Sequence, residues 1–333
     1  MSEESPSSTL LRLVQGSWVT QALHVAATLG IADELRDGPA TSDRLAAATG
    51  AHPDALHRLL RYLVSLGVLT GDDDGFRLTP VGELLRTDAP GSERERAIAY
   101  GTWNYEAFAG LLHTIRTGEA AFHHVFGMSP YGYLAQHPEK ARFFDRQMAR
   151  NEALFAKVPD VYDFSGTRKV VDVAGGNGAL LSAILAAAPH ARGVLFDAHH
   201  VVEAARDRLR ERGVLDRCEL AGGNFLESVP AGGDVYILSR VLHNWPDEDC
   251  RTLLSNCRTA MATGGRLLIF EHLLPDEDPG AQAVALDINM MALFNGRERT
   301  GAELGVLLAD TGFELLDRHA LHNDTTMLTA RSH

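Results

Sequence analysis

The chain has 333 residues, of which 45% are hydrophobic and 23% are charged, and its formal net charge is −13. This composition is typical of an ordinary globular protein that is long enough for two domains. The acidic balance argues against a nucleic-acid partner, since phosphate binding needs clustered cations. No apolar run is long enough to cross a bilayer, and the opening residues MSEESPSSTL are polar, so we expect a cytoplasmic protein without membrane contact.

Cysteine and histidine usage argues against disulfides and metals. The three cysteines, Cys218, Cys250 and Cys257, are odd in number and form no CxxC pair, so no disulfide framework is expected. The histidines include two adjacent pairs, at 123–124 and 199–200, but neighbours in sequence do not share a helix face. No HxH or HxxxH spacing converges, and we therefore predict no metal site.

The N-terminal half has a helical pattern. Residues 1–9 are predicted to be a flexible tail. From residue 10 to residue 162 apolar residues recur at helical spacing, as in LLRLVQGSWVTQALHVAATLGIADEL. This run is more apolar than one face of a monomer needs, which predicts a homodimer formed mainly by this half.

A winged-helix pattern lies within this half. Residues 41–69 predict helix, turn and helix, with Ser42 as a plausible N-cap and Gly50 as a stop. The segment LTGDDDGFRLT follows as a hairpin. A DNA-binding regulator is one interpretation, but three aspartates at the hairpin tip would repel phosphate. We therefore expect residues 10–162 to serve dimerisation and to cover the substrate.

The C-terminal half, residues 163–333, alternates short apolar strands with helices. This alternation predicts a Rossmann-like, doubly wound α/β domain with a mostly parallel sheet, whose ligands bind beyond the carboxyl ends of the strands. The expected strands cover 169–175, 192–198, 218–225, 234–242 and 266–273, and the expected helices cover 178–189, 201–213 and 247–265.

The first of these strands leads into a glycine-rich turn, VDVAGGNGALL, at residues 171–181. NAD, FAD and S-adenosylmethionine (SAM) sites all use such a turn, but the phosphate fingerprint GxGxxG is absent and the spacing is D-x-A-x-G-x-G. Asp197 ends the second strand, where a carboxylate can accept both hydroxyls of a ribose. A further segment, SRVLHNW, places His243 just past another strand, which makes it a candidate for the site as well as for the core.

Six motifs in order carry a resemblance over essentially the whole chain. They are VVDVAGGNG, LFDA, GGNF, DVYILSRVLHNWPDED, LLIFEHLLP and DINMMALFNGRERTGAEL. The chain resembles the SAM-dependent O-methyltransferases of the caffeate and plant-phenolic type, including their actinobacterial relatives that make natural products such as antibiotics.

The resemblance implies roles for individual residues. His243 matches the general base, and Glu271 and Glu298 match two acids that flank and orient it. The matching SAM-binding positions are the turn residues Ala174, Gly175, Gly176 and Gly178, the ribose acid Asp197, the adenine contacts Asn224 and Phe225, and Ser239 near the methionine tail.

Three positions depart from the family pattern. Ala174 replaces a glycine, which is tolerable if its φ stays negative. Asn224 replaces an aspartate, and its amide oxygen can still accept a hydrogen bond from adenine. Asn244 replaces the aspartate of the frequent HDW, which puts in doubt any role for a carboxylate beside the base.

Methyl transfer to a phenol explains why these residue types fit. The acceptor oxygen must lie in line with the methyl–sulfur bond and lose its proton as it attacks. A free phenol has a pKa near 10, so a histidine base is useful at neutral pH, and a carboxylate behind it fixes its tautomer. Candidates for contact with a small hydroxylated aromatic or polyketide-type acceptor are Trp103, Phe144, Met148, Phe155, Asn244, Met290 and Phe294.

Two questions stay open from the sequence. Some relatives in the family bind SAM without transferring its methyl group and carry out hydroxylation or another rearrangement, so a non-methylating enzyme is the alternative. The acceptor, the position methylated, and transfer to oxygen rather than to carbon or nitrogen are also open. A correctly placed base favours O-methyl transfer.

Overall fold

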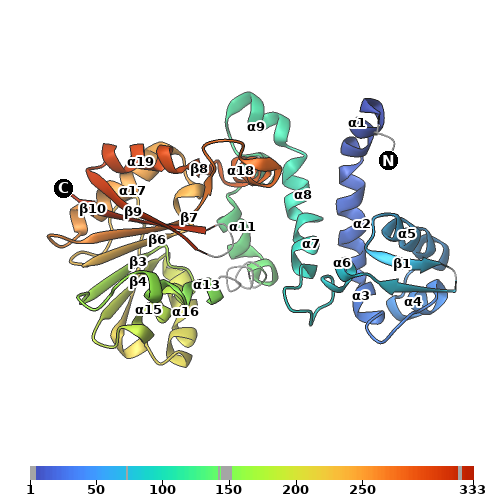
Figure 1. The fold of residues 1–333 in the computed structure, drawn as a ribbon, viewed down its shortest axis with the longest axis horizontal. Helices are drawn as coiled ribbons and strands as arrows, with labels where there is room; N and C mark the ends of the chain where they lie inside the picture. Colours follow the sequence, from blue (N-terminus) through green and yellow to red (C-terminus); the bar gives the residue numbers. More distant parts are fainter. Residues whose placement is uncertain (1–4, 73, 142, 144–151, 322–324) are drawn as a thin grey trace. The chain divides into compact units, whose positions relative to one another are not determined.

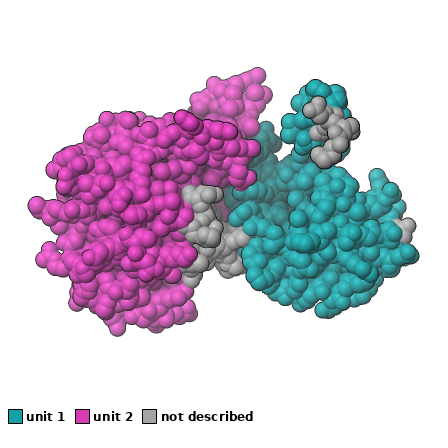
Figure 2. Space-filling model, viewed as in Figure 1, with its two compact units in different colours: residues 1–110 teal, residues 111–333 magenta. Residues whose placement is uncertain are grey.

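The computed structural model describes residues 5–72, 74–141, 143, 152–321 and 325–333. Its contacts divide the chain into two compact units, residues 1–110 and 111–333 (Figure 2). This boundary differs from the one predicted after residue 162, because residues 111–162 pack with the second unit. Helix α1 (Pro6–Val14) begins inside the predicted tail, since its proline suits a first helical turn and the Ser5 hydroxyl caps it.

The first unit contains the expected helix–turn–helix and hairpin. Gly50 ends the first helix of the pair with a φ of +69°, as predicted. The N-cap is Thr41 and not Ser42, because the Thr41 hydroxyl accepts a backbone N–H of the first turn. The helix pair is α4 (Ser42–Thr49) and α5 (Pro53–Ser65), and the hairpin is β1 (Leu69–Asp72) and β2 (Gly75–Leu78). The unit's other elements after α1 are α2 (Gly16–Leu29), α3 (Ile31–Glu34), α6 (Pro80–Glu83), α7 (Arg94–Tyr100) and α8 (Trp103–Phe108).

The second unit begins with short helices and continues as a sheet covered by helices. None of its described helices, nor any of the first unit's, is long and apolar enough to span a membrane. The leading helices are α9 (Leu111–Thr117), α10 (Ala121–Phe126), α11 (Pro130–Gln136), α13 (Glu152–Phe155) and α14 (Val158–Val161).

The sheet has the strand order β5-β4-β3-β6-β7-β10-β9, with β8 paired to β7 off this path. The first five strands of this order run parallel, whereas β10 is antiparallel to both β7 and β9. The predicted α/β fold is therefore confirmed, with an antiparallel C-terminal pair added. The strands are β3 (Lys169–Val173), β4 (Arg192–Asp197), β5 (Cys218–Gly222), β6 (Val235–Ser239), β7 (Arg266–Leu274), β8 (Arg299–Thr300), β9 (Phe313–Ala320) and β10 (Thr325–Ser332).

Helices cover both faces of this sheet (Figure 1). Apolar side chains of α15 and α16 pack against one face, and those of α17 and α19 pack against the other. Both faces are buried, so the strands are nearly continuous apolar runs, which is why the sequence revealed them. The remaining elements are α15 (Ala179–Ala187), α16 (His199–Glu211), η1 (Leu215–Arg217), η2 (Leu242–Asn244), α17 (Asp247–Ala260), α18 (Gly280–Phe294) and α19 (Gly301–Asp310).

Candidate active site

The strand order brings the glycine-rich turn and the histidine segment to one edge of the sheet. Strand β3 pairs with β4 on one side and with β6 on the other, so the chain changes direction across the sheet at β3. The glycine-rich turn follows β3, Asp197 ends β4, and η2 with His243 follows β6. The predicted SAM-binding and catalytic segments are therefore neighbours at the carboxyl ends of parallel strands.

The glycine-rich turn has a strained residue where the sequence suggested none. Ala174 has a φ of +55°, which corrects the expectation of a negative φ, and this conformation costs an alanine roughly 1 kcal/mol or more. The Phe196 carbonyl accepts the N–H groups of Ala174 and Gly175, at 2.7 and 3.3 Å, and holds the turn against β4. A Cβ on Gly175 would lie 2.6 Å from the Asp172 carboxyl carbon, so only glycine fits there.

Two carboxylates lie beneath this turn. The Asp197 carboxylate accepts the Gly176 N–H at 2.9 Å and the Ala198 N–H at 2.7 Å. Asp172 is 1% exposed, and its oxygens have no hydrogen bond of good geometry among the described residues. Burial, with the nearby Asp197 charge added, raises the pKa of Asp172 to about 7. Asp172 is the first residue of the D-x-A-x-G-x-G motif, but it was not among the predicted SAM contacts.

The other predicted SAM contacts are partly occupied by local interactions. Asn224 is exposed, and its amide accepts the Leu226 N–H at 3.0 Å and donates to Glu227 at 3.1 Å. Phe225 packs edge-on against Trp245, with ring centroids 5.3 Å apart. Ser239 is half-buried at the carboxyl end of β6. Their contacts with adenine and methionine stay predictions.

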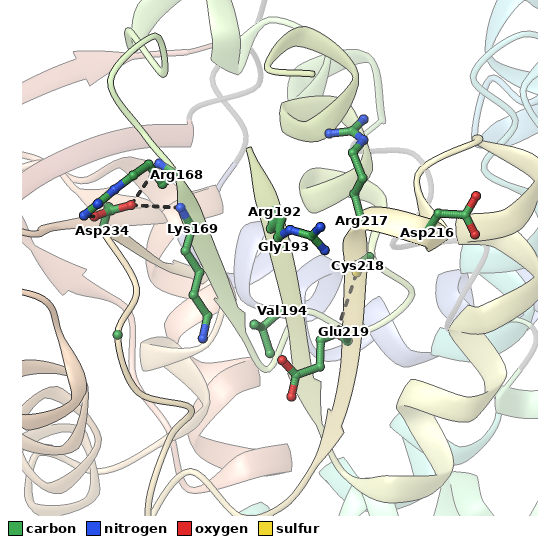
Figure 3. A pocket seen from close by; sticks show the side chains of 11 residues that line it. Arg168, Lys169, Arg192, Gly193, Val194, Asp216, Arg217, Cys218, Glu219 and Asp234 are labelled. Atoms are coloured by element: carbon green, nitrogen blue, oxygen red, sulfur yellow. Dashed lines mark hydrogen bonds and ion pairs between the residues drawn. The ribbon is translucent and has the colours of Figure 1, made fainter. Parts of the chain in front are cut away.

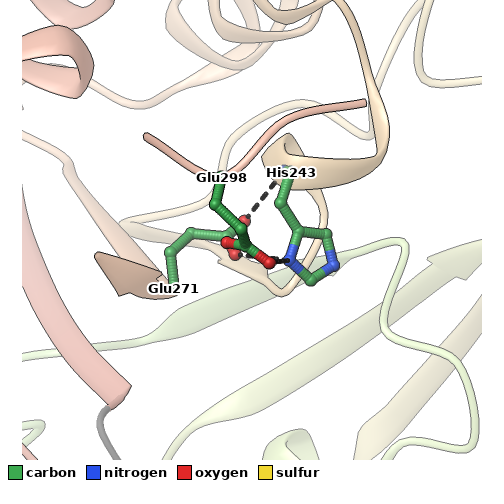
Figure 4. Close-up of side chains that lie close together, drawn as sticks. All are labelled: His243, Glu271 and Glu298. Carbon is green, nitrogen blue, oxygen red and sulfur yellow. Dashed lines mark hydrogen bonds and ion pairs between the residues drawn. The ribbon is translucent and has the colours of Figure 1, made fainter. Parts of the chain in front are cut away.

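His243 and the two predicted glutamates converge (Figure 4). His243 Nδ1 lies 3.3 Å from Glu271 Oε2 and 3.4 Å from Glu298 Oε1. All three residues are buried, with 6%, 2% and 2% of their surfaces exposed. In Figure 4 both carboxylates approach the Nδ1 side of the ring, and Nε2 points away from them.

Strand pairing explains why Glu271 and Glu298, which follow His243 by 28 and 55 positions, lie beside it. Ser239 is in register with Phe270, so the segment after β6 lies beside Glu271 of β7. Leu273 is in register with Arg299, which places Glu298, the residue just before β8, beside the end of β7. The backbone N–H of His243 also approaches Glu271 Oε1, at 3.4 Å.

Burial and the neighbouring charges act in opposite directions on the two glutamates. Burial raises the pKa of Glu271, and the Glu298 charge adds to this effect, while His243 and Arg240 oppose it. Burial also opposes ionisation of Glu298, but the hydrogen bond and charge of His243 and the charges of Arg240 and His272 outweigh it, so its pKa is lowered. Arg240 was not predicted, because nothing in SRVLHNW shows that its side chain turns toward these acids.

The same three residues offer ligand atoms that all lie within 4.8 Å of one another, a set that could hold a metal ion. Their separations equally suit an ion pair in which Nδ1–H points between the two carboxylates, with neither contact aligned as a strong hydrogen bond. Metal independence therefore stays a prediction.

Three of the predicted acceptor contacts, Met290, Phe294 and Asn244, lie in α18 and η2 of the second unit. Met290 is buried and Phe294 half-buried in α18, and the Phe294 ring lies 5.6 Å from that of Tyr131 in α11. Asn244 donates to the Arg240 carbonyl at 3.2 Å.

The remaining candidates are less well supported. Phe155 is buried in the core that α15 and α16 share, so packing accounts for it. Trp103 lies in α8 of the first unit, and its acceptor contact stays a prediction. Phe144 and Met148 lie outside the described residues.

A hollow of about 570 Å³ lies at the opposite ends of these strands (Figure 3). Its lining includes Lys169 and Cys218, which begin β3 and β5. Its Asp234 carboxylate accepts the Arg168 and Lys169 N–H groups at 2.8 Å, and its Arg217 donates to carbonyls at the end of α15. These side chains hold the fold together, and the hollow is far from the chemistry described above.

Comparisons with known proteins agree with this arrangement. A family profile described as the O-methyltransferase domain matches residues 108–314, and one described as the O-methyltransferase dimerisation domain matches residues 11–88. The phenazine O-methyltransferase PhzM of Lysobacter antibioticus is 48% identical over 311 residues, which cover 93% of this chain and 91% of that protein. The aclacinomycin 10-hydroxylase RdmB of Streptomyces purpurascens is 38% identical over 309 residues, which cover 90% of this chain and 83% of that protein.

A solved structure extends the comparison to ligands. The O-methyltransferase NcsB1 from neocarzinostatin biosynthesis was crystallised with S-adenosylmethionine and 2-hydroxy-5-methyl naphthoic acid. It is 34% identical, has a TM-score of 0.85, and the match covers 95% of this chain and 96% of that one. The match extends over both units of the fold.

Proposed function

The chain belongs to the SAM-dependent O-methyltransferases, and from this premise we propose that it methylates a hydroxyl of a small aromatic metabolite with His243 as the general base. One observation carries the assignment of the base. Glu271 and Glu298 approach the same ring nitrogen, Nδ1, at 3.3 and 3.4 Å. This arrangement supports a tautomer with the imidazole proton on Nδ1, which would leave Nε2 free to accept one.

The proton then has a defined route. As the acceptor oxygen attacks the methyl carbon, its proton moves to His243 Nε2, and the methyl–sulfur bond breaks. The imidazolium that forms faces two buried carboxylates, which stabilise its charge. Before the reaction His243 is neutral, so Arg240 offsets one of the two negative charges, and burial raises the pKa of Glu271 and so disfavours the second charge.

The residues beneath the glycine-rich turn fit SAM. When bound, SAM supplies an electrophilic methyl group on a cationic sulfur. The unpartnered oxygens of Asp172 suit a cationic ligand, and the Asp197 carboxylate keeps lone pairs for ribose hydroxyls beyond its two backbone bonds. Gly175, where a Cβ would not fit, lets the backbone lie close above Asp172.

An aromatic acceptor suits the residues of α11 and α18. Tyr131 and Phe294 place two rings in contact, and Met290 adds a polarisable side chain that adapts to flat molecules. The relative and the solved structure named above act on or hold aromatic molecules by their names, which supports the same class here.

The competing function is hydroxylation without methyl transfer, because one relative is named a hydroxylase. The two carboxylates behind His243 favour methyl transfer, which needs a base. The test is incubation with SAM carrying a ¹³C-labelled methyl group and a panel of phenolic metabolites. We expect the label on a hydroxyl oxygen and one S-adenosylhomocysteine per product. A product that gains oxygen while SAM is not consumed would overturn the proposal.

We propose that the protein is a homodimer built mainly by the first unit. The matched dimerisation profile covers residues 11–88, and an apolar surface is exposed on α1 and the start of α2. It consists of Leu10, Leu11, Leu13, Val14 and Trp18. Apolar surfaces of this kind usually mark interfaces. Sedimentation velocity at micromolar concentration should show a dimer, and a monomer would contradict this assignment.

A further inference from the structure

Arg299 is buried beside the turn that carries His243, although it does not touch the histidine ring. It is 3% exposed. Its guanidinium donates to the Leu242 and Trp245 carbonyls, each at 2.8 Å, and these two residues flank the turn. Nε and one terminal nitrogen also donate to Asp247 Oδ1, at 3.0 and 2.8 Å.

The turn η2 has few interactions of its own. A three-residue 3₁₀ turn is closed by backbone bonds of poor geometry, here from Asn244 to Val241 at 3.1 Å and from Trp245 to Leu242 at 3.2 Å. A planar guanidinium presents five N–H donors in a fixed arrangement, so it can hold two carbonyls and a carboxylate together. Loss of the Arg299 bonds would leave the Leu242 and Trp245 carbonyls, at the ends of η2, without their charged donor.

Residues 296–299 contact both the backbone and the ring of His243. The Arg297 N–H donates to the His243 carbonyl at 2.9 Å. Glu298 faces Nδ1 of the ring, and Arg299 holds the ends of the turn. A Cβ on Gly296 would lie 2.0 Å from the His243 oxygen, so the two segments are in close backbone contact.

We propose that Arg299 is a positioning residue for methyl transfer. By holding the carbonyls of Leu242 and Trp245, it keeps His243 Nδ1 against Glu271 and Glu298 and keeps Nε2 directed at the acceptor. The inference rests on the proposed role of His243 as the base. Asp247 anchors the guanidinium from the start of α17, so the pair Arg299–Asp247 forms one unit.

The test compares Arg299→Lys with His243→Ala on two acceptors, an ordinary phenol and one that is already ionised at the assay pH. Lysine keeps the charge but cannot reach both carbonyls and Asp247 at once. On the phenol we expect turnover of Arg299→Lys to fall by roughly 10-fold or more, with SAM affinity unchanged. On the ionised acceptor it should remain within about threefold of wild type, because no base is needed.

A double variant shows whether Arg299 acts through His243. If it does, His243→Ala/Arg299→Lys should be no slower on the phenol than His243→Ala alone, since the two changes remove one contribution. Arg251→Lys is the matched control, because Arg251 lies on α17, the helix that Asp247 begins, and pairs with Asp310 at the surface. It should behave as wild type on both acceptors.

The outcomes separate two kinds of failure. If Arg299→Lys loses turnover equally on both acceptors, or the double variant is slower than His243→Ala, Arg299 only supports the fold and the inference is wrong while the base assignment stands. If His243→Ala keeps full turnover on the phenol, the proposed function fails and the inference fails with it. Should Arg299→Lys not fold, Asp247→Asn weakens the same unit, and we expect it to show a smaller loss confined to the phenol.

Discussion

Two neighbouring parts of the sheet edge hold buried acids, and they differ in how the negative charge is balanced. Around β3 and β4, Asp172 has no cationic partner among the described residues, and Asp197 is met by backbone N–H groups. Around β7 and β8, Glu271 and Glu298 face His243 and Arg240. In the first part a SAM molecule would supply the positive charge that Asp172 lacks, whereas in the second part the chain's own His243 and Arg240 act on the two glutamates. Changes in the first should therefore alter SAM affinity, and changes in the second should alter turnover.

The largest effect is expected at His243. His243→Ala should lower turnover on an ordinary phenol by roughly 10²–10⁴-fold and leave SAM affinity nearly intact, because only proton removal is lost. His243→Gln should be nearly as impaired, and Glu271→Gln less so, since it orients the base without taking the proton. Steady-state rates with calorimetric SAM titrations measure both quantities. If His243→Ala also weakened SAM binding, the assignment of SAM affinity to the first part and turnover to the second would be wrong.

Asp197→Ala should show the opposite pattern. Loss of charge-assisted bonds to ribose hydroxyls should weaken SAM binding by roughly 1.5–3 kcal/mol. Once SAM is saturating, turnover should recover most of its wild-type value. Calorimetry gives the affinity, and an unchanged affinity would remove Asp197 from the ribose site.

SAM affinity should also depend on pH through Asp172. In the folded protein Asp172 keeps its proton up to about pH 7, whereas an exposed aspartate ionises near pH 4. The ionised form attracts a cation, so affinity should rise by up to about tenfold between pH 6 and 7.5, below the range where an α-amino group ordinarily titrates. Asp172→Asn should flatten this rise, and Asp160→Asn, at an exposed position, should not. The same slope in Asp172→Asn would assign the titration to another group.

Folding stability should change with pH in the opposite direction to SAM affinity: ionisation of Asp172 lowers it. A raised pKa means that the proton on Asp172 stabilises the folded state fully below pH 4, and that this contribution is lost as the pH rises to about 7. The pKa of Asp172 in the folded protein lies about three units above that of an exposed aspartate, which corresponds to a loss of about 4 kcal/mol of unfolding free energy at most. Urea unfolding at pH 5 and 8 should therefore show a smaller loss of stability for Asp172→Asn than for wild type.

The smallest effect concerns the glycine-rich turn. Ala174→Gly should stabilise the protein by about 0.5–1 kcal/mol, because glycine adopts a φ of +55° without the strain of a Cβ. Ala186→Gly, in the exposed part of α15, is the matched control and should destabilise by a similar amount. Urea unfolding compares the two, and a loss of stability in both would contradict the strained conformation.

The parallel strands could be predicted from the sequence, and so could the convergence of His243, Glu271 and Glu298. Buried parallel strands are short apolar runs, so β3, β4 and β7 were found nearly at their observed bounds. The strand predicted to end at residue 242 instead ends at Ser239, because the buried Val241 and Leu242 belong to the turn that follows. The antiparallel pair β9 and β10 was missed, because β9 is half-exposed and carries charges, and β10, although mostly buried, is rich in threonine and forms no continuous apolar run.

The balance of charge could not be predicted. Whether Asp172 has a partner, and whether Arg240 and Arg299 turn toward η2, depends on contacts between segments far apart in the chain. The positive φ of Ala174 depends likewise on its bond to Phe196 of the neighbouring strand.

The central claim, that His243 removes the acceptor proton, is tested most directly by a series of phenols of graded acidity. The rate of methyl transfer by wild type should depend weakly on acceptor pKa, because His243 removes the proton that a weakly acidic phenol would otherwise keep. His243→Ala should be slowest on the least acidic phenols and should approach wild type on those ionised at the assay pH. If the two enzymes differ by the same factor across the series, His243 supports the site in another way and the assignment of the base is wrong.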